Sequence, residues 1–218
     1  MPSLTPSPRT TLHRLPSRGS YDRGLIDAIL DEALICHVGF CEDGQPYVLP
    51  MNYARVGDAI YFHGSVASRL LCALERGAPV CATVTLLDGL VLARSAFHHS
   101  MNYRSVVILG VAREVTAADE KRAALTAIVE HVLAGRSADV RGPSDGELAT
   151  TLVLSLPITE ASAKVRAGPP VDSKEDQRIP CWAGEIPLAL TAGSPRPDSG
   201  LAPGIPVPAG VASYKRRP

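Results

Sequence analysis

The chain has 218 residues, 45% of them hydrophobic and 20% charged, so it can bury one core and is expected to form one domain. Its 22 basic and 22 acidic residues balance, which gives no sign of a nucleic-acid or anionic membrane surface. No apolar run is long enough to span a bilayer, and no secretory signal opens the chain, so we expect a cytoplasmic protein.

Residues 1–20 contain four prolines and no acidic residue, which favours a flexible N-terminal arm over a transit peptide because no apolar face is present. The stretch 22–34 then carries apolar residues at helical spacing, with Ser20 or Asp22 available as the N-cap. We therefore expect one amphipathic helix that leads into a sheet.

An antiparallel meander follows this helix. Strands are predicted over 35–40, 46–55 and 59–63, and a short helix is predicted from Ala67 to an end at Gly77. Asp88-Gly89 separates two further apolar runs and predicts a β-hairpin, and a third run covers 106–112. The polar segment 98–105 is expected to lie between the strands of this region, where binding groups are often found.

The clearest helical pattern runs over 119–133, and strand-like segments return at 151–156 and 162–166. Beyond Gly168 the chain holds ten of its nineteen prolines, which argues against much regular structure. We predict a barrel domain over 21–167 and a C-terminal extension over 168–218 that packs on the barrel or on a dimer partner. The fold class is mainly β with helices, a small antiparallel barrel with helical plugs.

Two segments could hold a cofactor. His63-Gly64-Ser65 is followed by Ser68 and Arg69 at the start of a helix, and hydroxyls, a guanidinium and free amides together suit a phosphate. The alternative is a capped surface helix. Asn102 to Ser105 could donate hydrogen bonds to a planar heterocycle, or could simply satisfy loop backbone.

A metal site is not expected. His37, His63, His98 and His99 invite the idea, but adjacent imidazoles in an extended segment point apart and no acidic residue stands at ligand spacing. The five cysteines form no C-x-x-C pair and are interpreted as free thiols. A haem site is a minor alternative, and no G-x-S-x-G motif supports a serine hydrolase.

Three strings, IYFHGSVASRLL, NYRSVVILGVAREVTAADEKRAAL and CWAGEIPL, occur in an order that resembles the pyridoxamine 5'-phosphate oxidase-like family of flavin-binding split barrels. The branch it resembles includes flavin-nucleotide-binding and nitroimidazole-resistance proteins. The resemblance covers residues 9–208 and implies a homodimer of six-stranded barrels with FMN in clefts at the subunit interface.

The resemblance also implies roles for individual residues. Ser68 and Arg69 match the phosphate-binding pair, and His63 lies beside the flavin. Tyr103, Arg104 and Ser105 match the segment that approaches the flavin edge. Met51 and Asn52 pass along the ring, and Trp182 reaches across the dimer.

The arginine-rich C-terminal strand of authentic pyridoxamine phosphate oxidases is absent, which puts that substrate in doubt. We therefore expect an FMN-dependent oxidoreductase of a small planar or nitro-aromatic compound, with His63, Tyr103 or His99 as the proton donor. The alternatives are a flavin carrier, store or sensor without turnover, and a barrel that serves only as an interaction module.

Overall fold

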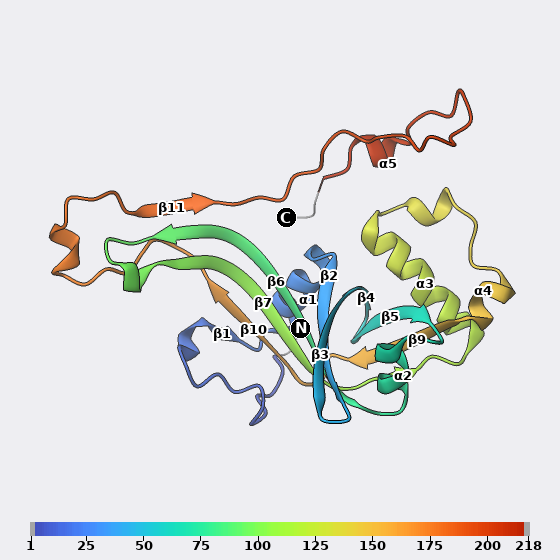
Figure 1. Ribbon diagram of the computed structural model, residues 1–218, viewed down its shortest axis with the longest axis horizontal. Coiled ribbons are helices and arrows are strands. Elements are labelled where there is room, and N and C mark those ends of the chain that lie inside the picture. The colour runs from blue at the N-terminus through green and yellow to red at the C-terminus, as the bar shows by residue number, and fades with distance from the viewer. Residues whose placement is uncertain (1–2, 216–218) are drawn as a thin grey trace.

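The computed structural model describes residues 3–215, and its strands form two antiparallel sheets (Figure 1). The large sheet has the order β1-β10-β7-β6-β2-β3, with β11 paired to β6, and the small sheet has the order β4-β5-β9-β8. The strands are β1 Gly19–Ser20, β2 Ile35–Glu42, β3 Gln45–Asn52, β4 Ala54–Val56, β5 Ala59–Ser65, β6 Pro79–Leu92, β7 Ser100–Val111, β8 Arg113–Glu114, β9 Thr151–Pro157, β10 Ala161–Arg166 and β11 Gly184–Pro187. The predicted mainly β, antiparallel fold is confirmed.

Helices flank these sheets as expected. They are α1 Arg23–Glu32, α2 Arg69–Glu75, α3 Ala118–Val132, α4 Asp145–Ala149 and α5 Ala209–Ala212, with 3-10 turns at Pro16–Arg18, Ala96–His98, Arg136–Ala138 and Asp176–Arg178. The Asp22 carboxylate caps α1 by accepting a hydrogen bond from the Leu25 amide at 2.7 Å. Gly77 has φ +87°, so the predicted left-handed end of the second helix is also confirmed.

The strand predicted over 46–55 is in fact two strands that belong to different sheets. β3 ends at Asn52 in the large sheet, and β4 begins at Ala54 in the small one. Between them Tyr53 is fully buried, and its hydroxyl donates to the Leu30 carbonyl at 2.5 Å. The chain therefore changes sheet at a side chain anchored beneath α1.

The hairpin predicted at Asp88-Gly89 is wrong. β6 continues through this pair, and the register with β7 shifts between Leu87 and Gly89, which marks a β-bulge. A Cβ on Gly89 would lie 3.0 Å from the Ile186 carbonyl oxygen, so the glycine allows β11 to approach closely. The chain reverses instead around Ala96–His98, and Ser100 to Ser105 belong to β7 and not to a loop.

The small sheet is covered on both faces, and its side chains point alternately into two different apolar clusters. Phe62 and Leu154 belong to the main core with α1 and α2, whereas Val153 packs with Val115 and Ala124 in a second cluster beneath α3. Because side chains alternate along a strand, β5 presents Tyr61 and His63 to the α3 side. This alternation positions the candidate site.

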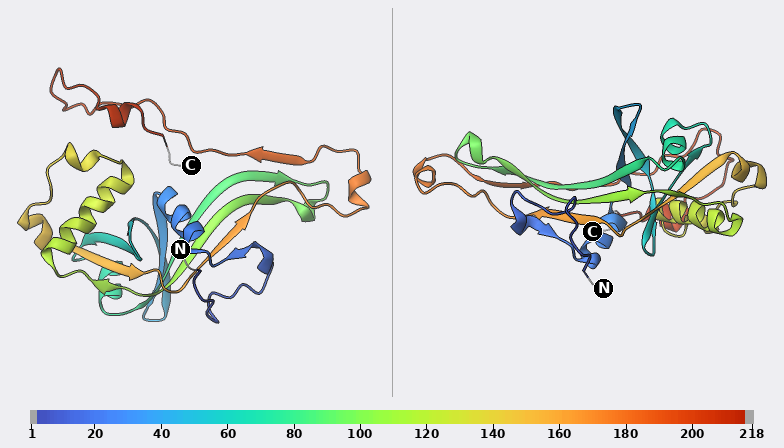
Figure 2. Two further views of the ribbon diagram at one scale, coloured as in Figure 1. Left: turned by 180° about the vertical axis from the view of Figure 1, so that it is seen from behind. Right: turned by 90° about the horizontal axis from the view of Figure 1, so that it is seen from below.

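The two terminal segments run along the outside of the sheets. In the N-terminal arm, Arg9 and Ser7 both bind the Glu160 carboxylate, and β1 pairs with β10. β11 follows the edge of the long β6–β7 ribbon, and residues 188–215 return across the molecule toward α3 (Figure 2). Trp182 is 67% exposed in the single chain, so the expected apolar anchor has no cover within it.

Candidate cofactor site

A cavity of about 720 Å³ lies between the small sheet and α3. Asn52 at the end of β3 and His63 on β5 both line it, so two predicted site residues from different sheets meet at one place. Its apolar lining comes from one face of α3 and the following loop and comprises Leu125, Ile128, Val129, Val132 and Val140. Its polar lining comprises Asn52, His63, Thr126, Arg136, Ser137, Arg141 and Glu147.

His63 is the most distinctive side chain of this cavity. Its Nδ1 is buried and has no hydrogen-bond partner among residues 3–215. Burial lowers the pKa of the imidazole, because removal from water disfavours the charged form. The neighbouring Tyr61, by contrast, donates its hydroxyl hydrogen bond to Glu120 of α3 at 3.2 Å. His63 is therefore held as a neutral imidazole with free hydrogen-bonding and metal-binding capacity.

Ser68 and Arg69, the two residues predicted to bind a phosphate, lie at the start of α2. The Ser68 hydroxyl caps the helix by accepting from the Leu71 amide at 3.5 Å. Arg69 is exposed, its guanidinium carbon lies 5.3 Å from the centre of the Tyr47 ring, and it donates to the Tyr47 hydroxyl at 3.2 Å. The nearest carboxylate oxygen, from Glu42, is 3.6 Å away from its Nε. Arg69 is thus oriented by an aromatic ring and stays open to an anion from solvent.

The predicted flavin-edge segment is divided by the alternation of β7. Tyr103 and Ser105 point to one face of the strand and Arg104 to the other. Arg104 donates hydrogen bonds to Asp88, at 2.8 and 2.9 Å, and to Glu32, and these bonds raise the pKa of its guanidinium above the ordinary arginine value. Because the Arg104 guanidinium is occupied by two carboxylates, it joins β6, β7 and α1. On the other face of β7, the Ser105 hydroxyl donates to the Lys164 carbonyl at 3.2 Å.

A buried polar network that the sequence did not indicate joins β10 and β11 to β7. Arg166 is buried and donates to the Asn102 amide oxygen and to the carbonyls of Gly168 and Pro169, at 2.6 and 2.8 Å for the carbonyls. Asn102 in turn donates to Glu185 of β11 at 2.5 Å. These partners are 64 and 83 positions apart, so no local pattern could have revealed them.

The remaining predicted site residues are separated from the cavity lining. Met51 is half-buried and packs against the main core next to Cys36, its partner in the β2–β3 register. Trp182 lies beside Gly184, where a Cβ would be 2.9 Å from the indole ring. Neither residue lines the cavity.

The other histidines considered for a metal are engaged or exposed. His98 Nδ1 lies 2.9 Å from the Ser95 hydroxyl, and His99 Nδ1 lies 2.9 Å from the Ser95 carbonyl oxygen. His37 is exposed on β2. Within residues 3–215 no group of three or more His, Cys, Asp or Glu side chains is arranged to hold a metal ion.

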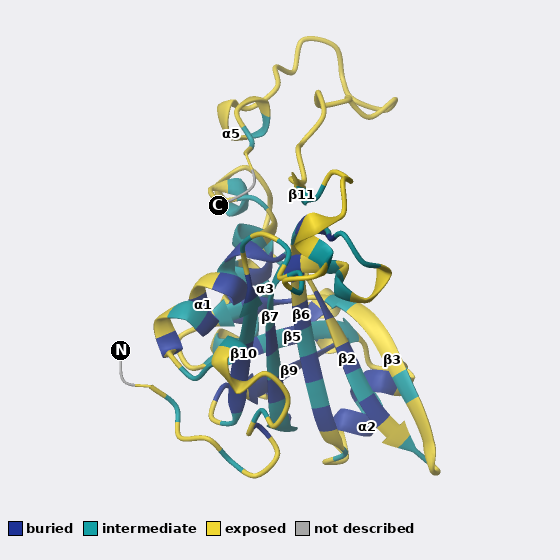
Figure 3. Cartoon of the chain, turned by 90° about the vertical axis from the view of Figure 1, so that its left-hand side faces the viewer, coloured by how far each residue is buried: buried dark blue, intermediate teal, exposed yellow. Residues whose placement is uncertain are grey.

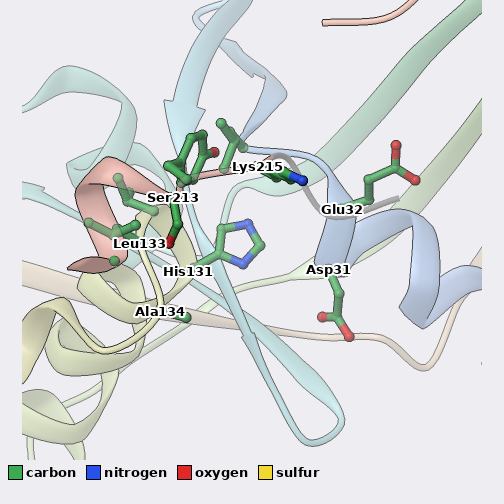
Figure 4. Close-up of a pocket in the computed structure, with 11 residues that line it drawn as sticks. Asp31, Glu32, His131, Leu133, Ala134, Ser213 and Lys215 are labelled. Atoms are coloured by element: carbon green, nitrogen blue, oxygen red, sulfur yellow. The ribbon is translucent and has the colours of Figure 1, made fainter. Parts of the chain in front are cut away.

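A second hollow of about 240 Å³ lies where the C-terminal residues meet α1 and α3 (Figure 4). His131 projects into it, but its Nε2 is 2.6 Å from the Ala33 carbonyl oxygen and its ring packs on Tyr53. Asp31 is paired with Arg55 at 2.6 Å, and Glu32 is paired with Arg104. Since Asp31, Glu32 and His131 have protein partners, this hollow is a weaker candidate than the cavity with His63.

The family model described as pyridoxamine 5'-phosphate oxidase matches residues 22–165, well over half of the chain. The chain belongs to the pyridoxamine 5'-phosphate oxidase family. This match confirms the resemblance read from the three strings, and the two antiparallel sheets are the split barrel of the family.

Solved structures agree with this membership. The flavocytochrome Anf3 from Azotobacter vinelandii is 41% identical, with a TM-score of 0.92 over 98% of this chain and 99% of that one. The FAD and haem binding protein from Mycobacterium smegmatis is 39% identical, with a TM-score of 0.86 over 89% of this chain and 95% of that one. A structure described as a 5-nitroimidazole antibiotic resistance protein from Bacteroides thetaiotaomicron is 29% identical, with a TM-score of 0.57 over 67% of this chain and 86% of that one.

These likenesses support flavin binding by this member of the family, without deciding between FMN and FAD. A comparison with curated proteins gives no match. Among the described residues, no helix has both the length and the apolar character needed to cross a membrane.

Proposed function

We propose that this chain binds a flavin and a haem and transfers electrons between them. The observation that carries the proposal is the likeness, over 98% of the chain and at 41% identity, to a flavocytochrome. A flavin exchanges electrons as pairs or singly, and a haem iron exchanges them singly, so the two groups together link two-electron and one-electron partners. A mainly apolar cavity with one neutral imidazole suits the second of these groups.

The flavin site proposed here uses the residues that the family resemblance identified. Ser68 and Arg69 hold the phosphate, and the face of β7 that carries Tyr103 and Ser105 approaches the ring. We propose FAD where the sequence alone led us to expect FMN, because the second full-length neighbour is an FAD and haem binding protein. The phosphate pair suits either flavin, since both carry a phosphate next to the ribityl chain.

We further propose a cytoplasmic homodimer in which the partner completes the flavin site. Exposed apolar side chains lie on β2, β3, β6 and β7, and Figure 3 shows β3 largely exposed. Ile35, Val48, Leu49, Leu87 and Met101 are among them. A surface of this kind is typical of an interface. Trp182, exposed in the single chain, is proposed to reach the partner's flavin.

A second function is favoured by the likeness to the nitroimidazole-resistance structure. In this alternative the flavin reduces a small planar or nitro-aromatic compound, and His63 or Tyr103 supplies a proton. A flavin carrier without turnover is the third possibility, and it predicts bound flavin with no electron transfer.

Anaerobic photoreduction of the reconstituted protein separates these functions. Under our proposal the flavin and haem absorption bands change together in one preparation. Rapid reoxidation by a nitroimidazole alone, with no haem present, would instead support the second function. Reduced flavin that passes electrons to neither acceptor would support the carrier.

A further inference from the structure

We propose that His63 is the axial ligand of the haem, held in the cavity between β5, the end of β3 and α3. This inference rests on the proposed function and assigns the haem a specific site within it. It follows from the position of one imidazole and from the character of the walls around it.

The cavity has the size and lining that a flat, largely apolar group requires. Its volume of about 720 Å³ lies in the range of cofactor pockets. α3 contributes Leu125, Val129 and Val132 to the lining, and the small sheet contributes His63. A planar ring bound in this cavity would have the imidazole of His63 and the aliphatic side chains of α3 as neighbours.

His63 is the imidazole best suited to bind iron. Haem iron is held in many proteins by one histidine, and the ligand must be neutral to offer its lone pair. His63 lines the cavity, and its Nδ1 is buried with no hydrogen-bond partner among residues 3–215, so no contact within the described chain competes for this nitrogen. The lowered pKa of this ring keeps it neutral near pH 7.

The other imidazoles are excluded by their surroundings. His98 and His99 are hydrogen-bonded to Ser95, and His131 contacts the Ala33 carbonyl oxygen. His13 and His37 are exposed. None of these five lines the cavity.

Two guanidinium groups at the cavity fit the carboxylates of a haem. Arg141 donates to Glu147 at 2.6 and 2.7 Å, and Arg136 donates to Asp139 at 3.4 Å. Both arginines line the cavity, and their pairs with Asp139 and Glu147 are exposed, so each pair is weak and a haem propionate can replace the protein carboxylate.

The test is reconstitution of the full-length protein with haemin and flavin, followed by absorption and electron paramagnetic resonance spectra. His63→Gly should lower haem affinity at least tenfold and change the ferric spectrum. Added imidazole should restore the spectrum of the unsubstituted protein. The control His13→Gln should change neither, and retained flavin in each variant shows that the barrel is folded.

A second variant keeps the proposal testable if the glycine variant fails to fold. His63→Cys should give the spectrum of a thiolate-bound haem. Unchanged haem affinity and spectra in His63→Gly or His63→Cys would overturn this inference and leave the proposed function standing. Unsubstituted protein that binds flavin but no haem would overturn the proposed function itself.

Discussion

Arg104 on β7 binds the Glu32 carboxylate at the end of α1, 72 positions earlier in the chain. Glu32 is buried, so the pair and its third member, Asp88, lock the helix to the long ribbon. The resemblance to the family suggested a role for Arg104 near the flavin edge, whereas its contacts in the folded chain are structural.

Arg104→Met should therefore destabilise the protein. Loss of the guanidinium removes the Arg104 hydrogen bonds from the buried Glu32 carboxylate, and we expect a loss of about 2 kcal/mol, since the arginine side chain itself is partly exposed. The measurement is urea unfolding at pH 7. Arg113→Met, which breaks an exposed pair with Glu120, is the control and should cost less than about 1 kcal/mol. Equal losses in the two variants would contradict the structural role.

Arg69→Ala tests the phosphate site. Because a charge-assisted hydrogen bond contributes about 1.5 to 3 kcal/mol, binding of FMN or FAD should weaken about tenfold to a hundredfold. Binding of riboflavin, which lacks the phosphate, should change little. Fluorescence titration with each ligand makes the comparison. A similar loss for riboflavin and FMN would show that Arg69 does not contact the phosphate.

Gly89→Ala tests the close approach of β11. A Cβ at this position meets the Ile186 carbonyl oxygen at 3.0 Å, and backbone cannot move aside as a flexible side chain can. We expect β11 to detach, so that trypsin cleaves the C-terminal segment several-fold faster. Gly146→Ala is the control, because its Cβ would meet nothing within 4 Å. An unchanged cleavage rate in Gly89→Ala would show that β11 tolerates the methyl group.

His63 should make the stability of the cofactor-free protein depend on pH. Its pKa is lowered in the folded state by burial, so below about pH 6.5 the unfolded chain binds more protons than the folded one. Stability contributed by the neutral ring is present above that pH and is lost as pH falls toward the folded pKa. Unfolding measured between pH 7.5 and 5 should show a smaller pH effect in His63→Gln. Identical pH profiles would mean that burial of His63 has no such effect.

The proposed dimer predicts a particle of twice the 23.0 kDa chain mass. Light scattering after gel filtration measures it directly. Trp182→Ala should leave the dimer intact and weaken flavin binding, since a single side chain is removed from a large interface. A monomer that retains its flavin would argue against a cofactor shared between subunits.

Elements whose signals are local were predicted correctly from the sequence, and one that depends on distant contacts was not. α1 with its Asp22 cap, and the end of α2 at Gly77, were predicted because their signals are local. Asp88-Gly89 was misread because a turn and a bulge use the same residues, and the choice depends on β11, far along the chain.

The candidate site was predictable only in part for a similar reason. His63 and Asn52 were recognised as candidates, and the apolar stripe of α3 was visible at helical spacing. That these three meet in one cavity depends on the change of sheet at Tyr53 and on the packing of α3 over β5. Tertiary packing of this kind leaves no mark on any single segment.

Whether the protein holds both cofactors is decided by the absorption spectrum of the purified protein, with the released chromophores identified by chromatography. We predict flavin bands and a Soret band in the same protein, from FAD and haem in about equal amounts. A protein that takes up flavin alone would contradict the account of an electron-transferring flavin and haem protein. A colourless protein that binds neither group would contradict the assignment of both sites.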